Sequence, residues 1–188
     1  MGQYYMATII SKEGDIKAIS PYPYGSGAKL MEHSYISDIY VNSVLNYLNK
    51  GDRLYWLGDY AEYEDLHNGD SKITKHKFEN LYSDVWTECS KTTQVPTSRE
   101  TPIYVINATK GCFVELDAIE FKSDRYGNRI NVVPLLCSVG NGKGGGDYRG
   151  INMGDCGAWA GDEIYATNNE EELIGLSDYT EFIDFYEG

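Results

Sequence analysis

The sequence of 188 residues lacks the features by which membrane and secreted proteins are usually recognised. No stretch of about 18 apolar residues is present, which excludes a conventional membrane-spanning helix. Residues 1–12 contain no basic leader followed by an apolar run, so the pattern of a secretory signal peptide is missing as well. Together these absences lead us to expect a cytoplasmic protein with no membrane partner.

Cysteine and histidine are few, and their spacing matches no common metal site. The chain has four cysteines and three histidines, and it contains no Cys-x-x-Cys pair of the kind that structural zinc sites use. The cysteines are Cys89, Cys112, Cys137 and Cys156. We therefore expect free thiols in a reducing compartment, no metal and no other cofactor. A metal held by cysteines from distant segments stays the alternative.

Motifs of nucleophilic catalysis are also missing. The sequence has no Gly-x-Ser-x-Gly element, and a Cys–His pair would have to be assembled from distant segments. Basic patches that would neutralise the phosphates of a nucleic acid are absent too. These gaps favour a protein that is not an enzyme and does not bind nucleic acid directly.

Glycine, in contrast, is concentrated between residues 140 and 150. A phosphate loop needs Gly-Lys followed by Ser or Thr and then a helix, whereas Gly144 follows Lys143 and no helical pattern comes after it. Backbone amides of glycine can still converge on an anion. The segment is therefore either a plain connection or a loop that binds a ligand or partner. The candidate ligand residues are Gly142, Lys143, Gly144, Asp147 and Arg149.

Several aspartates directly follow a glycine. Carboxylates at such turns could converge on Mg²⁺ or Ca²⁺ or act as an acid–base pair, but Gly-Asp is also ordinary turn chemistry. Both interpretations stay open at this point. The candidates among them are Asp59, Asp147, Asp155 and Asp162.

Basic residues disappear altogether from the last fifth of the chain. Residues 150–188 contain ten of the 29 Asp and Glu residues but no Lys, Arg or His, so most of the net charge of −13 arises there. Such a field repels nucleic acids and anionic membranes and attracts basic partners. It is either a solvated acidic face or a binding surface.

Aromatic residues interleave with these acids. Rows of carboxylates beside aromatic rings can imitate a nucleic-acid backbone with its bases, which a protein that binds nucleic acid through Lys and Arg would accept. The candidate partner-binding residues are Glu170, Glu171, Glu172, Asp178, Tyr179, Glu181, Asp184, Tyr186 and Glu187.

Hydrophobic periodicity predicts one acidic α+β domain over residues 1–188, with an acidic C-terminal segment at 150–188. We expect a mainly antiparallel sheet of about five to seven strands with two or three helices packed on it. The expected strands are 3–11 and 16–20, joined as a hairpin, then 53–57, 103–108, 112–121, 130–139 and 159–166. The expected helices are 37–49, 74–88 and 178–186.

Three local details refine this prediction. Ser34 or Ser37 is expected to cap the first helix. Pro134 places the 130–139 strand at an edge or a bulge, and that strand is expected to complete an antiparallel meander. The repeated pattern of 56–59 and 159–162, Trp-x-Gly-Asp, predicts two strand ends that are neighbours in one sheet.

Several short blocks resemble a group of small acidic proteins of bacteria and their phages. These blocks are Met1-Gly2-Gln3-Tyr4-Tyr5, 29–33, 57–62, 144–147 and 159–162. The resemblance implies a bacterial host cell and carries over no catalytic residue. By type, such proteins include inhibitors of host defence, among them anti-CRISPR proteins.

The sequence thus predicts a non-enzymatic acidic interaction protein. We expect it to inhibit a bacterial nuclease, such as a CRISPR effector, by occupying the basic surface that binds nucleic acid. The alternative is a small enzyme or ligand-binding domain that uses the glycine-rich loop 140–150 and nearby aspartates.

Overall fold

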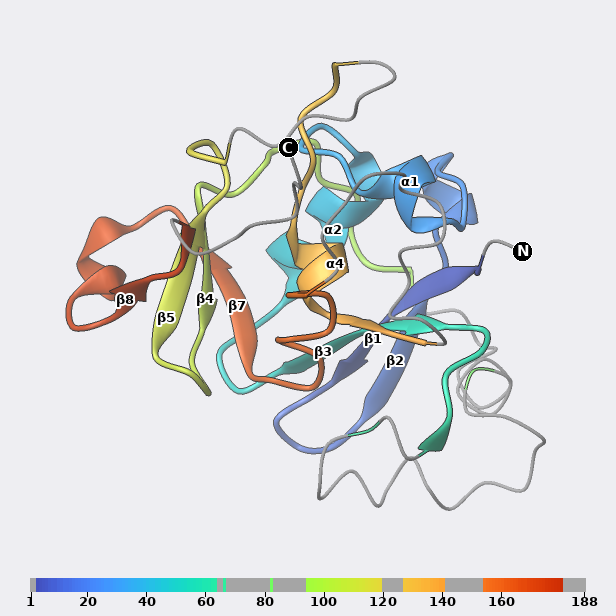
Figure 1. Ribbon diagram of the computed structural model, residues 1–188, viewed down its shortest axis with the longest axis horizontal. Coiled ribbons are helices and arrows are strands. Elements are labelled where there is room, and N and C mark those ends of the chain that lie inside the picture. The colour runs from blue at the N-terminus through green and yellow to red at the C-terminus, as the bar shows by residue number, and fades with distance from the viewer. Residues whose placement is uncertain are drawn as a thin grey trace.

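The computed structural model describes residues 3–63, 66, 82, 94–119, 127–140 and 154–180, and the structural statements below concern these residues. Within them the chain forms two four-stranded sheets and three α-helices, which confirms the predicted α+β class. The eight strands are one more than the upper end of the expected range. Figure 1 shows the helices gathered above the first sheet, with the second sheet beside them.

The first sheet has the strand order β2-β1-β3-β6. The predicted hairpin is confirmed, because β1 (Tyr5–Ile10) pairs antiparallel with β2 (Ile16–Ile19) around a turn in which Gly14 has φ 86°. β1 also pairs antiparallel with β3 (Arg53–Gly58). All six residues of β1 are buried, as expected for a central strand covered on both faces. The last strand, β6 (Ser138–Val139), runs parallel to β3.

The second sheet has the strand order β7-β4-β5-β8. β4 (Tyr104–Asn107) and β5 (Cys112–Glu115) form the predicted antiparallel hairpin, whose turn contains Gly111 at φ 65°. β7 (Ile164–Thr167) pairs antiparallel with β4, and β8 (Ser177–Asp178) pairs parallel with β5. A 3₁₀ helix, η5 (Glu170–Leu173), lies between β7 and β8 in the chain.

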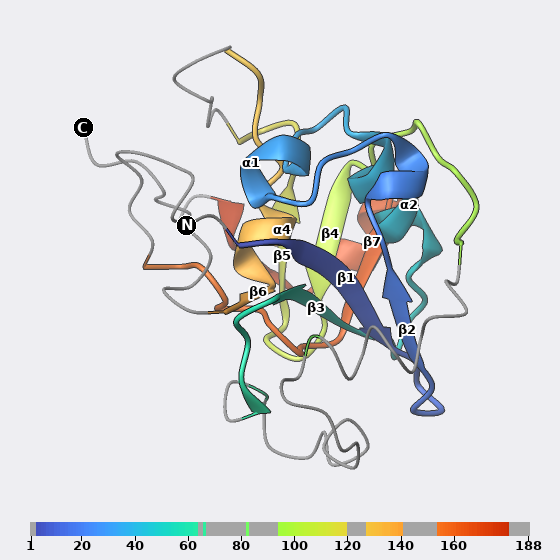
Figure 2. The ribbon, with the colours of Figure 1, turned by 90° about the vertical axis from the view of Figure 1, so that its right-hand side faces the viewer.

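The helices lie against the core that the two sheets share (Figure 2). They are α1 (Leu30–His33), α2 (Ile39–Tyr47) and α4 (Val133–Leu136), and a 3₁₀ turn, η1 (Tyr22–Tyr24), precedes them. One buried cluster joins residues of α2 and α4 to inward-facing residues of both sheets. A smaller buried cluster covers the other face of the first sheet.

Helix α2 confirms the first predicted helix but not its cap. The capping side chain is Asp38, whose Oδ1 accepts a hydrogen bond from the Val41 amide at 3.1 Å, and neither Ser34 nor Ser37 takes that role. Aspartate is as good an N-cap as serine, so residue type alone does not favour the two expected serines over Asp38. The polar face of α2 is covered by the extended segment 94–101, where Asn46 Nδ2 donates to the Glu100 carbonyl at 2.8 Å.

The predicted strand at 130–139 is wrong. Ile130 forms only an isolated bridge with Tyr35, residues 133–136 form α4, and only Ser138 and Val139 are in a strand, which joins the first sheet rather than a meander with β5. Pro134 stands in the first turn of α4, where its fixed φ suits a helix. Residues 130–139 are all buried, so their apolar side chains show neither the helical nor the strand periodicity that would separate the two structures.

The other differences concern segment ends. The predicted strand at 112–121 ends at Glu115, and residues 116–118 form a turn. The predicted strand at 159–166 begins only at Ile164, and Asp178, the expected first residue of the last helix, belongs to β8. Residues 181–188 and nearly all of the predicted helix 74–88 lie outside the described residues. Trp56 lies within β3 rather than at its end. The prediction of two neighbouring strand ends in one sheet is wrong, because residues 159–162 form a turn before β7 of the second sheet, whereas β3 belongs to the first. That turn contacts β3 at Leu54, whose carbonyl accepts from the Gly161 amide at 2.8 Å.

A buried aromatic group connects α1, α2 and β3. Trp56 Nε1 donates to His33 Nε2 at 2.7 Å, and the Tyr40 and His33 rings lie nearly perpendicular to each other with centroids 5.2 Å apart. His33 Nδ1 lies 2.8 Å from the Gly27 carbonyl, which can only accept, so Nδ1 carries the proton and His33 is neutral. Burial lowers the pKa of His33 to about 4.

This arrangement predicts that mild acid destabilises the fold. Because the pKa of His33 is lower in the folded protein than the ordinary value of 6.5, the unfolded chain takes up a proton first as the pH falls. We expect the free energy of unfolding to fall by about 2 kcal/mol between about pH 7.5 and pH 5. Denaturant unfolding across that range measures it.

The His33→Gln variant is the control for this prediction, since it should lose the pH dependence whatever its overall stability. Asp38 contributes with the opposite sign, because burial raises the pKa of that carboxyl and protonation then favours the folded state. An equal slope in wild type and variant would show that His33 is not the group responsible.

Candidate acidic interaction surface

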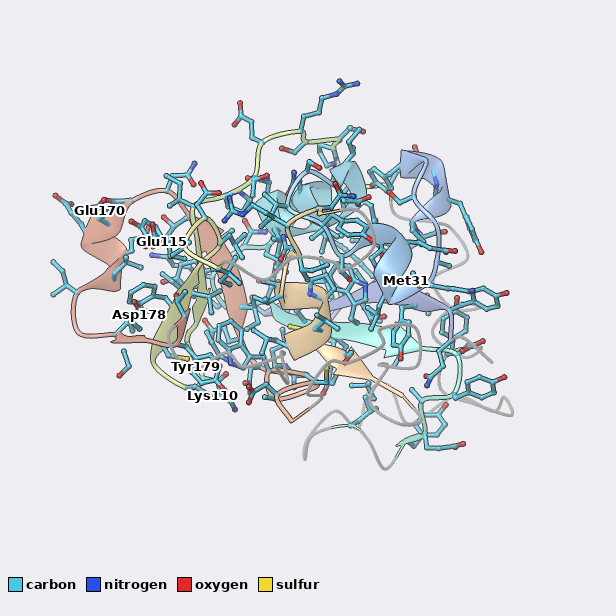
Figure 3. The ribbon with its side chains drawn as sticks, turned by 45° about the horizontal axis from the view of Figure 1, so that its top comes forward. Met31, Lys110, Glu115, Glu170, Asp178 and Tyr179 are labelled. Carbon is cyan, nitrogen blue, oxygen red and sulfur yellow. The ribbon has the colours of Figure 1, made fainter. Side chains whose placement is uncertain are left out.

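Four carboxylates from three segments lie on the outer side of the second sheet. Glu115 ends β5, Glu170 and Glu171 begin η5, and Asp178 lies in β8. Figure 3 shows the labelled Glu115, Glu170 and Asp178 on one side of the molecule, far from Met31. These four residues are called the acidic surface below.

Two aromatic rings hold the sheet under the acidic surface. Tyr104 is opposite Glu115 in the β4–β5 pair, and its ring meets that of Phe113 edge-on with centroids 5.9 Å apart. The Tyr104 hydroxyl donates to Glu170 Oε1 at 3.4 Å. Desolvation and the Glu170 and Glu115 carboxylates raise the pKa of Tyr104, which keeps the hydroxyl protonated as a donor. Tyr104 therefore links carboxylates that are distant in sequence.

Backbone hydrogen bonds fix the position of Asp178. The amides of Ser177 and Tyr179 donate to the carbonyls of Gly111 and Phe113, at 3.0 and 2.8 Å, which docks β8 along β5. The Asp178 carboxylate accepts from the Thr180 amide at 2.8 Å. Asp178 thus stays exposed to solvent on a short, well-anchored strand.

Glu172 is the one described glutamate of η5 that turns away from solvent. Its Oε2 lies 2.6 Å from Lys50 Nζ, and its Oε1 accepts from the Thr167 hydroxyl at 3.0 Å. The Lys50 contact, followed by that of Thr167, lowers the pKa of Glu172. Lys50 also lies over the Tyr165 ring, 5.0 Å from its centroid. Glu172 therefore anchors the turn, and its charge is compensated within the chain.

The remaining candidates that the sequence predicts for partner binding are not part of the acidic surface among the described residues. Tyr179 packs beside Trp159 with ring centroids 5.5 Å apart, and its hydroxyl lies 3.5 Å from Asp155 Oδ1, so the ring belongs to the core side rather than to the surface. The others, Glu181, Asp184, Tyr186 and Glu187, lie outside the described residues.

The described candidates among the aspartates that follow glycine, Asp59, Asp155 and Asp162, each have their own partners. Asp162 Oδ2 accepts from Asn107 Nδ2 at 2.8 Å and lies 2.9 Å from Lys110 Nζ, whereas Asp59 Oδ1 accepts from the Tyr4 amide at 3.1 Å. Within the part of the chain that the structure describes, no three His, Cys, Asp or Glu residues could hold a metal ion together. The described residues therefore offer structural carboxylates rather than a metal centre.

The predicted ligand loop lies outside the described residues from Asn141 to Gly150, but its starting point is known. It follows Gly140 at the carboxyl end of β6, which runs parallel to β3. The carboxyl ends of parallel strands meet at the same edge of a sheet, so Asp59 and Gly140 emerge together. A side chain at Gly140 would collide with Gln3 Oε1, only 2.2 Å from the position of its Cβ.

A surface cavity of about 290 Å³ lies at the start of α2. Its acid, Asp38, is already used, because one carboxylate oxygen accepts from Val41 and the other from the Ser26 hydroxyl at 2.8 Å. The cavity thus presents no free charged group. Its lining residues are Tyr24, Gly25, Ser26, Tyr35, Ser37, Asp38, Ile39 and Asn128.

Sequence reasoning missed two members of the surface region. Glu115 falls in a strand pattern and gave no functional signal, while Ile174 read as an ordinary apolar residue although its side chain is 83% exposed. The sequence clue was Gly175, which follows Ile174 and adopts φ 86°, a conformation typical of a tight turn.

Comparisons with known proteins give no precedent for this arrangement: no family model, no curated protein and no solved structure matches the chain. Across the described residues, every helix is too short or too polar to cross a bilayer.

Proposed function

We propose that this chain is a non-enzymatic interaction protein that binds the basic, nucleic-acid-binding surface of a bacterial nuclease, such as a CRISPR effector, in the cytoplasm. One observation carries the proposal. Glu115, Glu170, Glu171 and Asp178 are held on ordered strands and turns, and within the described residues none of them forms an ion pair with Lys, Arg or His. Uncompensated charge on a fixed frame is what electrostatic complementarity needs.

The lysine side chains near the second sheet also support an uncompensated acidic surface. Lys50 is paired with Glu172 and Lys110 with Asp162, so the described cations near the surface are engaged by inward-facing acids and leave the outer carboxylates free. A partner that offers Lys and Arg at the spacing of phosphates would supply the missing positive charge. A partner without a basic surface would gain little.

The experiment is a cleavage assay with purified single-protein CRISPR effector nucleases, each tested with and without guide RNA. We expect the wild-type protein to inhibit DNA cleavage, more weakly at high salt. Reversing the surface to lysine at Glu115, Glu170, Glu171 and Asp178 should weaken inhibition by about 100-fold or more, because like charges then face each other.

A matched control changes the same amount of charge elsewhere. Lysine at Glu13, Asp15, Glu62 and Glu100, which are all exposed and belong to other segments than the acidic surface, should change inhibition by no more than about threefold. If the surface and control variants behave alike, or if inhibition does not respond to salt, the proposed surface is wrong.

A second candidate function is ligand binding at the carboxyl ends of β3 and β6. The parallel pairing of these strands favours it, because Asp59 and Gly140 emerge at one sheet edge, a common place for ligands in sheets with parallel strands. A nucleotide, a phosphate compound or Mg²⁺ should then raise the melting temperature, and Asp59→Asn should reduce that shift. Unchanged melting with all of these probes would count against this candidate.

A further inference from the structure

Ile174 has an apolar side chain that is exposed to solvent. It is 83% exposed, more than any other large hydrophobic residue described, the next being Tyr22 at 63%. It lies between η5 and β8, in the turn that projects from the second sheet at the left of Figure 1. Single exposed hydrophobic residues are common on protein surfaces, so exposure alone carries little meaning.

The turn that carries Ile174 is closed by hydrogen bonds at both ends. Asn169 Oδ1 accepts from the Glu171 amide at 3.1 Å, and the Leu176 amide donates to the Leu173 carbonyl at 2.9 Å. Glu172 ties the same turn to Lys50. A side chain on such a preorganised turn loses little backbone freedom when it is buried in a partner. Ile174 therefore has the properties of an anchor residue.

The charges around Ile174 restrict what can cover it. Glu170 and Glu171 precede it in the same turn, and Asp178 follows in β8. A second copy of this chain would bring more negative charge, since the protein carries −13, and nucleic acids or anionic lipids would be repelled in the same way. A positively charged partner, in contrast, can bury Ile174 and at the same time offset the charge of Glu170, Glu171 and Asp178.

We infer that Ile174 is the apolar anchor of the acidic surface and inserts into an apolar pocket of the partner that is rimmed by Lys or Arg. This inference rests on the proposed function and adds a requirement to it: positive charge alone is not sufficient for tight binding. Central apolar anchors surrounded by polar contacts are the usual organisation of binding hot spots. The partner class is a basic protein surface with a hydrophobic pocket, rather than any polycation.

Two synthetic helical peptides of equal length and equal positive charge test this requirement. One carries a stripe of leucines between its lysines, and the other has serine in place of leucine. We expect the leucine peptide to bind about tenfold more tightly, the gain typical of burying one good apolar anchor. In protein labelled with ¹³C at the isoleucine methyl groups, the Ile174 signal should shift on binding, and Ile174→Val identifies that signal.

Ile174→Ser should remove the preference for the leucine peptide and leave binding of the serine peptide unchanged. Tyr60→Ser is the matched control, since Tyr60 is also exposed, at 45%, but follows β3 in the first sheet. Circular dichroism checks that both variants are folded.

The outcomes separate the two proposals. If the leucine preference is absent, or if it survives Ile174→Ser, the anchor is wrong while the acidic surface stands. If neither peptide binds at low salt, both proposals are wrong. Concentration-dependent association in sedimentation that is lost in Ile174→Ser would replace the basic partner with a second copy of the chain.

Discussion

Replacing Asp162 with alanine is expected to lower the free energy of unfolding by about 2 to 3 kcal/mol. The Asp162 side chain is only 7% exposed and receives Asn107 Nδ2 at 2.8 Å and Lys110 Nζ at 2.9 Å. Its removal leaves a buried amide and an ammonium group without their acceptor. The contact matters for the whole fold, because the backbone of Asp162 is also hydrogen-bonded to Leu54 in β3, so this residue joins the two sheets.

Chemical denaturation of variants measures this effect. Asp162→Asn keeps an oxygen that can accept from Asn107 and should cost less than Asp162→Ala. Glu163→Ala, at the next position, is the control and should stay within about 0.5 kcal/mol of wild type, since Glu163 is only partly buried. Equal losses at positions 162 and 163 would contradict a specific role for the buried carboxylate.

Tyr40→Phe is expected to cost about 2 to 4 kcal/mol, although it removes only one oxygen atom from the core. The Tyr40 hydroxyl accepts from the Ala7 amide at 2.6 Å and donates to the Ile19 carbonyl at 2.7 Å. Ala7 and Ile19 are partners in the β1–β2 register, so the hydroxyl bridges the two strands. Phenylalanine would leave two buried backbone groups without this partner.

Tyr47→Phe is the matched control for this substitution. The Tyr47 hydroxyl accepts from Lys17 Nζ at 2.5 Å and is partly exposed, so its loss should cost no more than about 0.5 kcal/mol. Urea unfolding of both variants is sufficient. A loss for Tyr40→Phe as small as that for Tyr47→Phe would show that water or a direct strand contact replaces the hydroxyl.

The predictability of the fold followed the strength of local signals. The hairpin 5–19 has alternating β-prone segments around a Lys-Glu-Gly-Asp turn, and α2 has an apolar face with helical spacing, and both were predicted. The run at 130–139 was not, because its side chains are buried on all sides and show no period. Capping by Asp38 was missed because three residues that can cap a helix, Ser34, Ser37 and Asp38, lie within five positions.

The candidate site was predictable in charge but not in geometry. The concentration of acids after residue 150 is visible in the sequence, and so is the clustering of three glutamates at 170–172. Their separate roles are not visible. Glu172 and Asp162 form salt bridges with lysines that lie more than 50 positions away in the chain. Glu170 and Glu171, in contrast, are exposed to solvent. Salt bridges of this separation depend on strand pairing, which no local pattern encodes.

By itself the sequence determined the α+β class, the local hairpins and the sign of the charge, because residue type and short-range spacing are enough for each. Only the tertiary structure decided which carboxylates face solvent and that Ile174 protrudes among them. It also decided that Asp162 and Glu172 are neutralised within the chain. The physical reason is that burial and ion pairing are properties of surfaces brought together from distant segments, and these exist only once the two sheets have packed.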